Sequence, residues 1–198
     1  MEPRLGKEGI RMKALIINAS PKKNGSTATA LDLLEKRLKA RYEVERVEAS
    51  DLAIRPCIGC SACRPDGRCV LPRDGAHEVG EKIAGADLLV FGSPCYWGNI
   101  PSTLKAIFDR NVTTFERFVG GLPQGKLGGK KALVLVTTGS PFPFSRMKNQ
   151  GGGTVGAIKT VLKSSGIKLL GVAHFDSAWN MNARMDATRK TIDRLRIK

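Results

Sequence analysis

Residues 13–27 read K-A-L-I-I-N-A-S-P-K-K-N-G-S-T, and this stretch decides the fold of the chain. Its apolar first half, residues 13–19, is typical of a strand buried on both faces of a parallel sheet. Strand, loop and helix in this order form the first half of a βαβ unit, so the stretch predicts an α/β domain. The helix is predicted from Ser26, because apolar side chains then recur at helical spacing, at Leu31, Leu34 and Leu38.

Short apolar runs of the same kind recur along the chain, with amphipathic stretches between them. Further helices are predicted after Pro101, before Gly166 and near the C-terminus. Alternating strands and helices in 198 residues fit one domain. We therefore predict a doubly wound five-stranded parallel sheet of order 2-1-3-4-5 between two helical layers. The four further strands are expected over residues 42–48, 87–92, 130–137 and 168–175.

Three segments fall outside this alternation. Residues 1–11 are polar and without pattern, so we expect a loose N-terminal extension before a single domain over residues 12–198. Two long loops are predicted, at 49–73, with a cysteine-rich insert at about 51–73, and at 115–129, which is Gly-rich. The apolar runs are too short to cross a bilayer, and no secretory signal precedes the first strand. These features indicate a cytoplasmic protein without a membrane partner.

The charge of the chain favours anionic partners. Lys and Arg number 33 against 18 Asp and Glu, which gives a formal net charge of +15. The basic residues are scattered over predicted helices and loops with few aromatic residues among them, so no nucleic-acid partner is expected. A phosphate-bearing cofactor or an acidic electron-carrier protein explains the net positive charge equally well.

The loop at residues 20–27 combines free backbone N–H groups with the positive end of a helix, a geometry that binds anions. Its sequence is neither the G-x-G-x-x-G of dinucleotide folds nor the G-x-x-x-x-G-K-[ST] of nucleotide triphosphatases, which disfavours nucleotide hydrolysis. A plain turn at Asn24-Gly25 with Ser26 as an N-cap is the structural alternative. Side-chain donors for an anion are available at Ser20, Lys22 or Lys23, Asn24, Ser26 and Thr27.

Two more polar loops follow strands at the same edge of the predicted sheet. G-S-P-C-Y-W-G-N-I-P-S at 92–102 follows the third strand, and T-T-G-S-P at 137–141 follows the fourth. In a sheet of order 2-1-3-4-5, ligands bind beyond the carboxyl ends of the first and third strands, where the direction of connection reverses. Three loops there could wrap one planar ligand. Tyr96 and Trp97 would line that ligand or a dimer contact.

Four cysteines, Cys57, Cys60, Cys63 and Cys69, follow the second strand with the spacing C-x2-C-x2-C-x5-C. Without an export signal, this clustering indicates metal or redox chemistry rather than structural disulfides. Thiolates at two-residue intervals can converge from one loop onto an iron-sulfur cubane, here expected at the same sheet edge as the polar loops. Zinc is the second interpretation, although four-Cys zinc sites usually place two C-x2-C pairs farther apart. Free or paired thiols are the third.

Three motifs together, A-S-P-K-K-N-G-S-T, C-I-G-C-S-A-C and S-P-C-Y-W-G-N-I-P-S-T-L-K-A-I-F-D-R, resemble the flavodoxin-like NAD(P)H-dependent FMN reductases, and within them the iron-sulfur flavoproteins. The resemblance covers nearly the whole chain from Met12. It implies a flavodoxin-like fold, FMN, a [4Fe-4S] cluster on the four cysteines and no catalytic acid or base. The FMN phosphate would then lie at Ser20, Lys22, Asn24, Ser26 and Thr27, and the ring system at Pro94, Cys95, Tyr96, Trp97, Gly98, Asn99, Thr138, Gly139 and Ser140.

The resemblance implies an FMN-dependent oxidoreductase or electron-transfer flavoprotein that couples FMN to the cluster. Its donor would be NAD(P)H or a ferredoxin-type protein, its acceptor a small quinone or flavin, and a homodimer or higher homo-oligomer is expected. The alternatives are a simple NAD(P)H-dependent FMN or quinone reductase without a cluster, and a zinc-containing nucleic-acid-binding protein. Cys95 is expected to be a small buried residue, and His77 and His174 to be structural.

Overall fold

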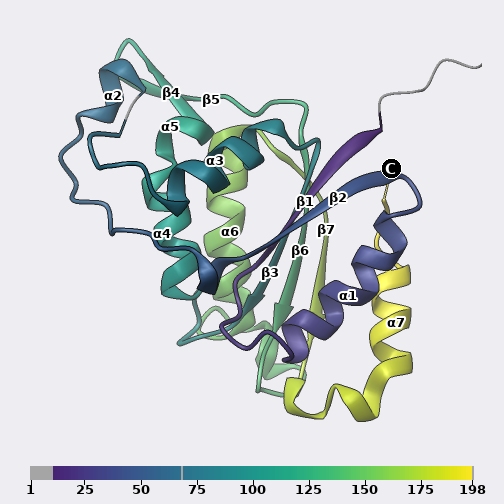
Figure 1. Ribbon diagram of the computed structural model, residues 1–198. Helices are drawn as coiled ribbons and strands as arrows, with labels where there is room; N and C mark the ends of the chain where they lie inside the picture. Colours follow the sequence, from purple (N-terminus) through teal and green to yellow (C-terminus); the bar gives the residue numbers. More distant parts are fainter. Residues whose placement is uncertain (1–10, 68, 198) are drawn as a thin grey trace, which may run out of the picture.

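The sheet has the predicted number and order of strands. In the computed structural model, which describes residues 11–67 and 69–197, five parallel strands lie in the order β2-β1-β3-β6-β7 (Figure 1). Numbered among themselves, these strands have the order 2-1-3-4-5, so the predicted doubly wound sheet is confirmed. The expected N-terminal extension lies outside the described residues, apart from Arg11. The strands are β1 (Met12–Asn18), β2 (Tyr42–Glu48), β3 (Leu88–Pro94), β6 (Lys131–Thr137) and β7 (Lys168–Phe175).

Helices cover both faces of the sheet and give the molecule three layers (Figure 1). Two apolar cores result, because the side chains of a strand alternate between its faces. Leu31 and Leu34 pack in one core, and Leu104 and Ile107 in the other, all fully buried. No helix in the described part of the chain is long and apolar enough to cross a membrane. One layer consists of α1 (Ser26–Leu38) and α7 (Met185–Asp193), and the other contains α3 (Gly75–Gly85), α4 (Ser102–Arg110) and α6 (Gly151–Ser165).

The edge strand β2 carries exposed charge. Tyr42 and Val47 are buried, whereas Glu43 and Glu45 are exposed. Arg46, on the same strand, pairs with the neighbouring carboxylates of α1 and β2. Charged side chains along an edge strand oppose its pairing with another sheet.

The segment 115–129, predicted to be one long loop, contains regular structure instead. The short helix α5 (Val112–Phe115) leads into an antiparallel hairpin of β4 (Glu116–Val119) and β5 (Leu122–Gly125). Gly120 and Gly121 form its turn with φ angles of 58° and 80°, which a two-residue hairpin turn of this kind requires. The loop prediction is wrong here, because Gly-Gly between two short strands is a hairpin signal.

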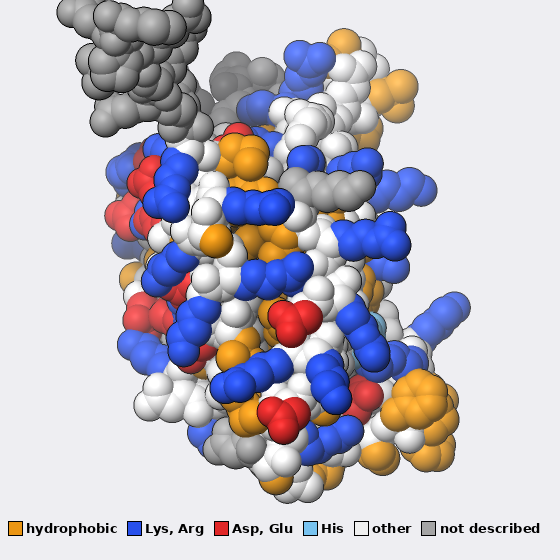
Figure 2. Space-filling model, turned by 90° about the vertical axis from the view of Figure 1, so that its right-hand side faces the viewer, with side chains coloured by type: hydrophobic (Ala, Val, Ile, Leu, Met, Phe, Trp, Pro, Cys, Tyr) orange, Lys and Arg blue, Asp and Glu red, His pale blue; other side chains and the backbone are white. Residues whose placement is uncertain are grey.

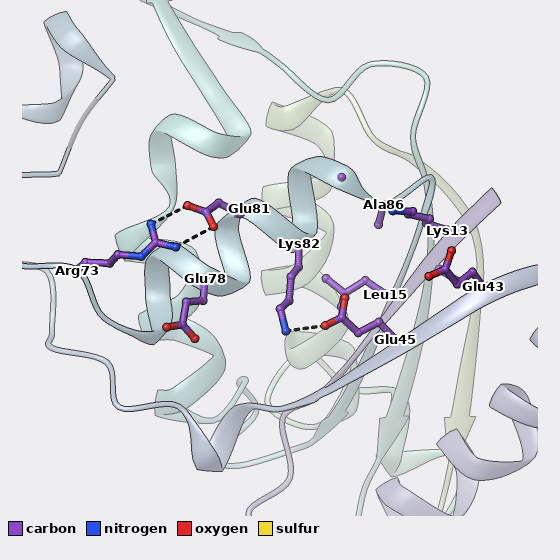
Figure 3. A pocket seen from close by; sticks show the side chains of 11 residues that line it. Lys13, Leu15, Glu43, Glu45, Arg73, Glu78, Glu81, Lys82 and Ala86 are labelled. Carbon is purple, nitrogen blue, oxygen red and sulfur yellow. Dashed lines mark hydrogen bonds and ion pairs between the residues drawn. The ribbon is translucent and has the colours of Figure 1, made fainter. Parts of the chain in front are cut away.

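The connection from β2 to β3 leaves part of the sheet open. Before α3 it contains only short helical pieces within the described residues, η1 (Ala49–Asp51) and α2 (Cys63–Asp66), and α2 lies near β4, away from the five-stranded sheet (Figure 1). A cavity of about 600 Å³ lies between α3 and the strands β1 and β2 (Figure 3). The ion pairs Lys82–Glu45 and Arg73–Glu81 line it. The cavity touches the first half of β1, so it lies away from the carboxyl ends of the strands.

Candidate functional site

The first turn of α1 leaves backbone donors free. Its N-cap is Gly25, which has extended backbone and no side chain to cap the helix. Among the described residues, the N–H groups of Ser26 and Thr27 therefore have no acceptor. The interpretation of Ser26 as the N-cap is wrong, because Ser26 is already the first helical residue. Free N–H groups and the positive end of a helix dipole are the features by which helix N-termini bind anions, and they lie here at the carboxyl end of β1.

Two of the predicted anion ligands use their hydroxyl groups elsewhere. The Thr27 hydroxyl is buried and lies 2.8 Å from the hydroxyl of Thr137 at the end of β6. The Ser26 hydroxyl donates to the carbonyl of Ala178, which follows β7. In this arrangement Ser26 and Thr27 offer an anion their backbone N–H groups rather than their hydroxyls.

The other predicted ligands lie in the loop itself. The Ser20 hydroxyl accepts a hydrogen bond from the Lys22 N–H at 3.2 Å and so shapes the turn. The Lys23 ammonium is paired with Asp51 at 2.7 Å, and this hydrogen bond raises the pKa of Lys23. The side chains of Lys22 and Asn24 are exposed. Lys22 is therefore the lysine of this loop that is available to an anion.

The loop after β3 makes a tight turn that displays an indole ring. Tyr96 and Asn99 exchange two backbone hydrogen bonds of 2.9 Å. Between them, Trp97 and Gly98 both have left-handed backbones, with φ of 53° and 71°, and the Trp97 side chain is fully exposed. This conformation is uncommon for a bulky residue and often occurs at functional sites. A Cβ atom at position 98 would approach the Asn149 backbone to 2.6 Å, so the turn requires glycine there.

The loop after β6 lies beside this turn. Cys95 packs against the core but is half-buried rather than buried as expected, and it donates its N–H to the Thr137 carbonyl at 2.9 Å. Pro94, just before it, ends β3 opposite Thr137. Thr138 is buried, and the Ser140 hydroxyl donates to the Gln150 side chain at 2.9 Å. The structure thus brings the three predicted loops to one edge of the sheet.

A fourth segment, which the sequence analysis missed, completes this edge. It is the turn η3 (Ala178–Asn180) after β7, where Trp179 lies so close to Gly139 that an added Cβ would be 2.7 Å from the indole. The Ala178 N–H donates to the Thr138 carbonyl at 2.8 Å, and the Ala178 carbonyl accepts the Ser26 hydroxyl. The turn therefore links the start of α1 to the loop after β6. The polar and aromatic stretch S-A-W-N, which follows the last predicted strand after Asp176, could have indicated this segment.

Large apolar side chains are exposed around this edge. Figure 2 shows a protruding hydrophobic group at the end of the molecule where the parallel strands finish. Contiguous exposed apolar side chains mark ligand or protein contacts. We call this surface the aromatic rim, and it consists of Trp97, Phe142, Phe144, Met147 and Trp179.

One buried ion pair holds both ends of the cysteine segment, residues 55–74. Arg110, at the end of α4, pairs with Asp74 at 2.7 Å and donates to the Arg55 carbonyl at 2.7 Å. Asp74 accepts the Arg55 N–H at 3.1 Å and forms a capping box with His77, so the structural role expected of His77 is confirmed. Burial alone would raise the pKa of Asp74, but hydrogen bonds from Arg110 and from backbone N–H groups lower it to about 2.

Both ends of the cysteine segment lie at the end of α4, where Arg55 and Asp74 contact Arg110. Cys57 lines a cavity together with Ser102, the first residue of α4. The second half reaches β4 and β5, where Figure 1 shows α2 and where the Arg64 guanidinium lies 5.2 Å from the centre of the Phe118 ring. The connection leaves β2 at the edge with the polar loops, as expected, because Asp51 there pairs with Lys23. The cysteine segment itself is held at the far end of α4 and extends to the hairpin of β4 and β5.

The thiols of this segment are free and differ in exposure. Cys57 and Cys60 are exposed, whereas Cys63 and Cys69 are half-buried. Burial, together with the charges of the other three cysteines, raises the pKa of the Cys63 thiol. In the part of the chain that the structure describes, no three potential ligands lie close enough to hold a metal ion. Four thiols suit iron-sulfur or zinc chemistry, and such a site requires the segment to close around the metal.

Comparison with known proteins agrees with this arrangement. Residues 12–197 match the Flavodoxin_2 family, described as a flavodoxin-like fold. An iron-sulfur flavoprotein of Archaeoglobus fulgidus is 32% identical over 163 residues, which cover 82% of this chain and 67% of that protein. The FMN-dependent NADH:quinone oxidoreductase 2 of Pseudomonas fluorescens is 32% identical over 145 residues, or 66% of this chain and 72% of the relative.

A solved structure shares the fold at lower identity. The FMN-dependent NADH-azoreductase of Bacillus anthracis, determined in complex with FMN, aligns with a TM-score of 0.71 at 17% identity. The alignment covers 92% of this chain and 96% of the azoreductase. With the family match over residues 12–197, the class of the protein is that of flavin-dependent oxidoreductases. The chain belongs to the flavodoxin-like NAD(P)H-dependent FMN reductase family, and iron-sulfur flavoproteins are among its relatives.

Proposed function

We propose that this chain binds FMN at the carboxyl edge of its sheet and transfers electrons from NAD(P)H to a small acceptor such as a quinone. The observation that carries the proposal is the uncapped start of α1, which lies at the end of β1 beside the Trp97-Gly98 turn after β3. An anion site and a turn with an exposed aromatic residue at this crevice match the two ends of a flavin mononucleotide.

The residues divide between the two ends of the ligand. Backbone N–H groups of Ser26 and Thr27, with the Ser20 turn and the side chains of Lys22 and Asn24, would hold the phosphate. The ring system would lie between residues 94–99 and 138–140, with Trp179 beside them. When bound, FMN supplies the hydride and electron chemistry, and the chain positions the ring and excludes water from one side of it.

Relatives support the identity of the donor and the acceptor. The Pseudomonas fluorescens relative is named as an NADH:quinone oxidoreductase that depends on FMN. This chain aligns with 72% of that relative. A two-electron donor and a quinone acceptor are the pair that a flavin can connect without a further cofactor.

Titration of the apoprotein with FMN and with riboflavin, which lacks the phosphate, tests the flavin site. Wild-type protein should bind FMN much more tightly than riboflavin. Lys22→Gln should lower the affinity for FMN roughly fivefold, as expected for the loss of an exposed charge pair, with little effect on the affinity for riboflavin. Lys36→Gln, on the exposed face of α1, is the matched control. Equal affinity of the wild type for both flavins would contradict a phosphate site at the start of α1.

A second centre is proposed on the cysteine segment. We infer that Cys57, Cys60, Cys63 and Cys69 ligate a [4Fe-4S] cluster that exchanges electrons with the flavin. Four free thiols within one segment whose two ends are held together support this assignment. Cys57 lines a cavity along α4, the helix that directly follows the loop that would border the flavin ring, so the segment and this loop meet the same helix.

Iron and acid-labile sulfide in anaerobically purified protein test the second centre. Wild type should contain both in near-equal amounts together with FMN, and Cys60→Ala should lose iron and sulfide but keep FMN. Cys95→Ala, outside the segment, should keep both. Zinc in place of iron, or FMN without any metal, would contradict the cluster and leave a simple FMN-dependent reductase.

A further inference from the structure

A second cavity lies along the outer edge of strand β7, lined by residues of η2, of α7 and of the turn before it, together with side chains from both faces of the strand. Its volume is about 310 Å³, at the lower end of the range for small-molecule sites. Arg146, Arg184 and Arg194 line it together with His174 and Asp176. Arginines from three segments of the chain therefore line one small volume.

The positive charge of this cavity is only partly neutralised. Asp176, the acidic residue in its lining, accepts two hydrogen bonds from Arg146, at 2.8 and 3.3 Å. Arg184 reaches only the Asp176 carbonyl oxygen, at 3.4 Å. Arg194 has no acidic partner within the described residues. Two guanidinium groups thus remain without a carboxylate, and guanidinium forks match the oxygens of a phosphate group.

His174 adds an unsatisfied polar atom. It lies at the end of β7 as expected, but its buried Nδ1 atom has no hydrogen-bond partner in the described part of the protein. Burial and the charge of Arg146 lower the pKa of His174 to about 4, with Asp176 acting in the opposite direction and Lys159 of α6 in the same direction. The ring is therefore neutral near pH 7 and can donate one hydrogen bond to an anion without needing a proton.

The cavity adjoins the proposed flavin site through two connections. Asp176 precedes Ser177, whose N–H donates to the Ser140 carbonyl at 3.2 Å in the loop after β6. Arg146 belongs to η2 (Phe144–Arg146), further along that same loop. Figure 2, which views the layer of α1 and α7, shows many Lys and Arg side chains and few carboxylates on this face. An anionic ligand that extends from the flavin edge thus meets positive charge in this direction.

We propose that the cavity along the outer edge of β7 binds a phosphate group of the dinucleotide that reduces the flavin. The proposal rests on the proposed function, because it takes NAD(P)H as the donor. Arg184 and Arg194 supply the charge, and His174 supplies a neutral donor. The nicotinamide end of the same molecule then lies over the flavin edge, and the two sites together orient the donor.

Calorimetric titration of FMN-loaded protein with adenosine 2′,5′-bisphosphate and with sodium pyrophosphate tests the cavity without any flavin chemistry. Tighter binding of the bisphosphate indicates the 2′-phosphate of NADPH, and tighter binding of pyrophosphate indicates the bridge common to NADH and NADPH. Arg184→Gln and Arg194→Gln should each lower the affinity for the probe that binds roughly tenfold, as expected for a lost charge-assisted hydrogen bond. Arg189→Gln, exposed on the same helix and outside the cavity lining, is the matched control and should bind as wild type does.

Steady-state kinetics supply the second measurement. Arg194→Gln should raise the KM for the dinucleotide with little change in kcat, while FMN content and reduction by dithionite stay as in wild type. If neither probe binds, or if Arg189→Gln weakens probe binding as much as Arg184→Gln and Arg194→Gln do, the proposed phosphate site is wrong. If the probes bind through Arg184 and Arg194 but neither dinucleotide reduces the flavin, the phosphate site stands and the proposed donor is wrong.

Discussion

Replacing Arg110 with Met removes the cation from an ion pair that is almost fully buried. The side chain of Arg110 is 1% exposed and that of Asp74 is 11% exposed. Met has a similar length and fills the space, so the main effect is an Asp74 carboxylate left without its charged partner. Breaking a buried pair in this way costs about 3–5 kcal/mol of the free energy of unfolding. The contact to the Arg55 carbonyl is lost as well, so both ends of the cysteine segment are released.

The pKa of Asp74 gives an independent magnitude. A decrease from 3.8 to about 2 corresponds to about 2 kcal/mol. Because the pKa is lower in the folded state, this stability is present above about pH 4 and is lost as the pH falls toward 2. Arg110→Met should therefore be less stable at pH 7, and should lose less of its remaining stability than wild type between pH 5 and pH 2.

Urea denaturation at pH 7 and at several lower pH values measures both effects. The matched control is Arg73→Met, which removes an exposed pair with Glu81 and should leave the free energy of unfolding nearly unchanged. Thermolysin should also cut before Ile58 or Val70, both exposed, faster in Arg110→Met than in the control, because the ends of the segment are no longer held. The reasoning is refuted if the two variants are equally stable, or if Arg110→Met keeps the acid dependence of wild type.

Three further changes have defined outcomes. Gly98→Ala should lower FMN affinity and cost about 1–3 kcal/mol, since the left-handed turn and the Asn149 backbone both oppose a Cβ, and FMN titration with urea denaturation would measure this. Thr27→Val leaves the buried Thr137 hydroxyl without its partner and should cost about 1–3 kcal/mol in the same denaturation assay, with FMN binding retained through the backbone; loss of binding would show that the hydroxyl itself is needed. Phe142→Ser should shift the expected homodimer toward monomer in light scattering, and an unchanged mass would exclude the aromatic rim as the contact.

The strand order followed from the sequence because buried parallel strands are short apolar runs. The runs at residues 13–19 and 130–137 have few polar interruptions, and their spacing leaves room for one helix between strands. The polar loops could be placed at one edge for the same reason, since all parallel strands end there. The hairpin after Phe115 was missed because each of its strands has four residues and one contains Pro123.

The local chemistry of the site was less predictable than its place. The sequence marks Ser26 and Thr27 as hydroxyl donors, but their hydroxyls bond to Ala178 and Thr137, which are 152 and 110 residues away. The course of the cysteine segment depends in the same way on Arg110, whose partners lie 36 and 55 residues earlier. Contacts of this separation leave no periodic pattern in the chain.

The charge on the two outer strands limits how copies of this protein can join. Exposed Glu43 and Glu45 lie along β2, and basic side chains line the groove beside β7, so neither edge of the sheet can pair with the same edge of a second copy without bringing like charges together. Symmetric dimers that pair two equivalent sheet edges are thereby disfavoured. Association is directed to the ends of the strands, where a closed pair of molecules would cover the aromatic rim and leave nothing for a third copy to bind.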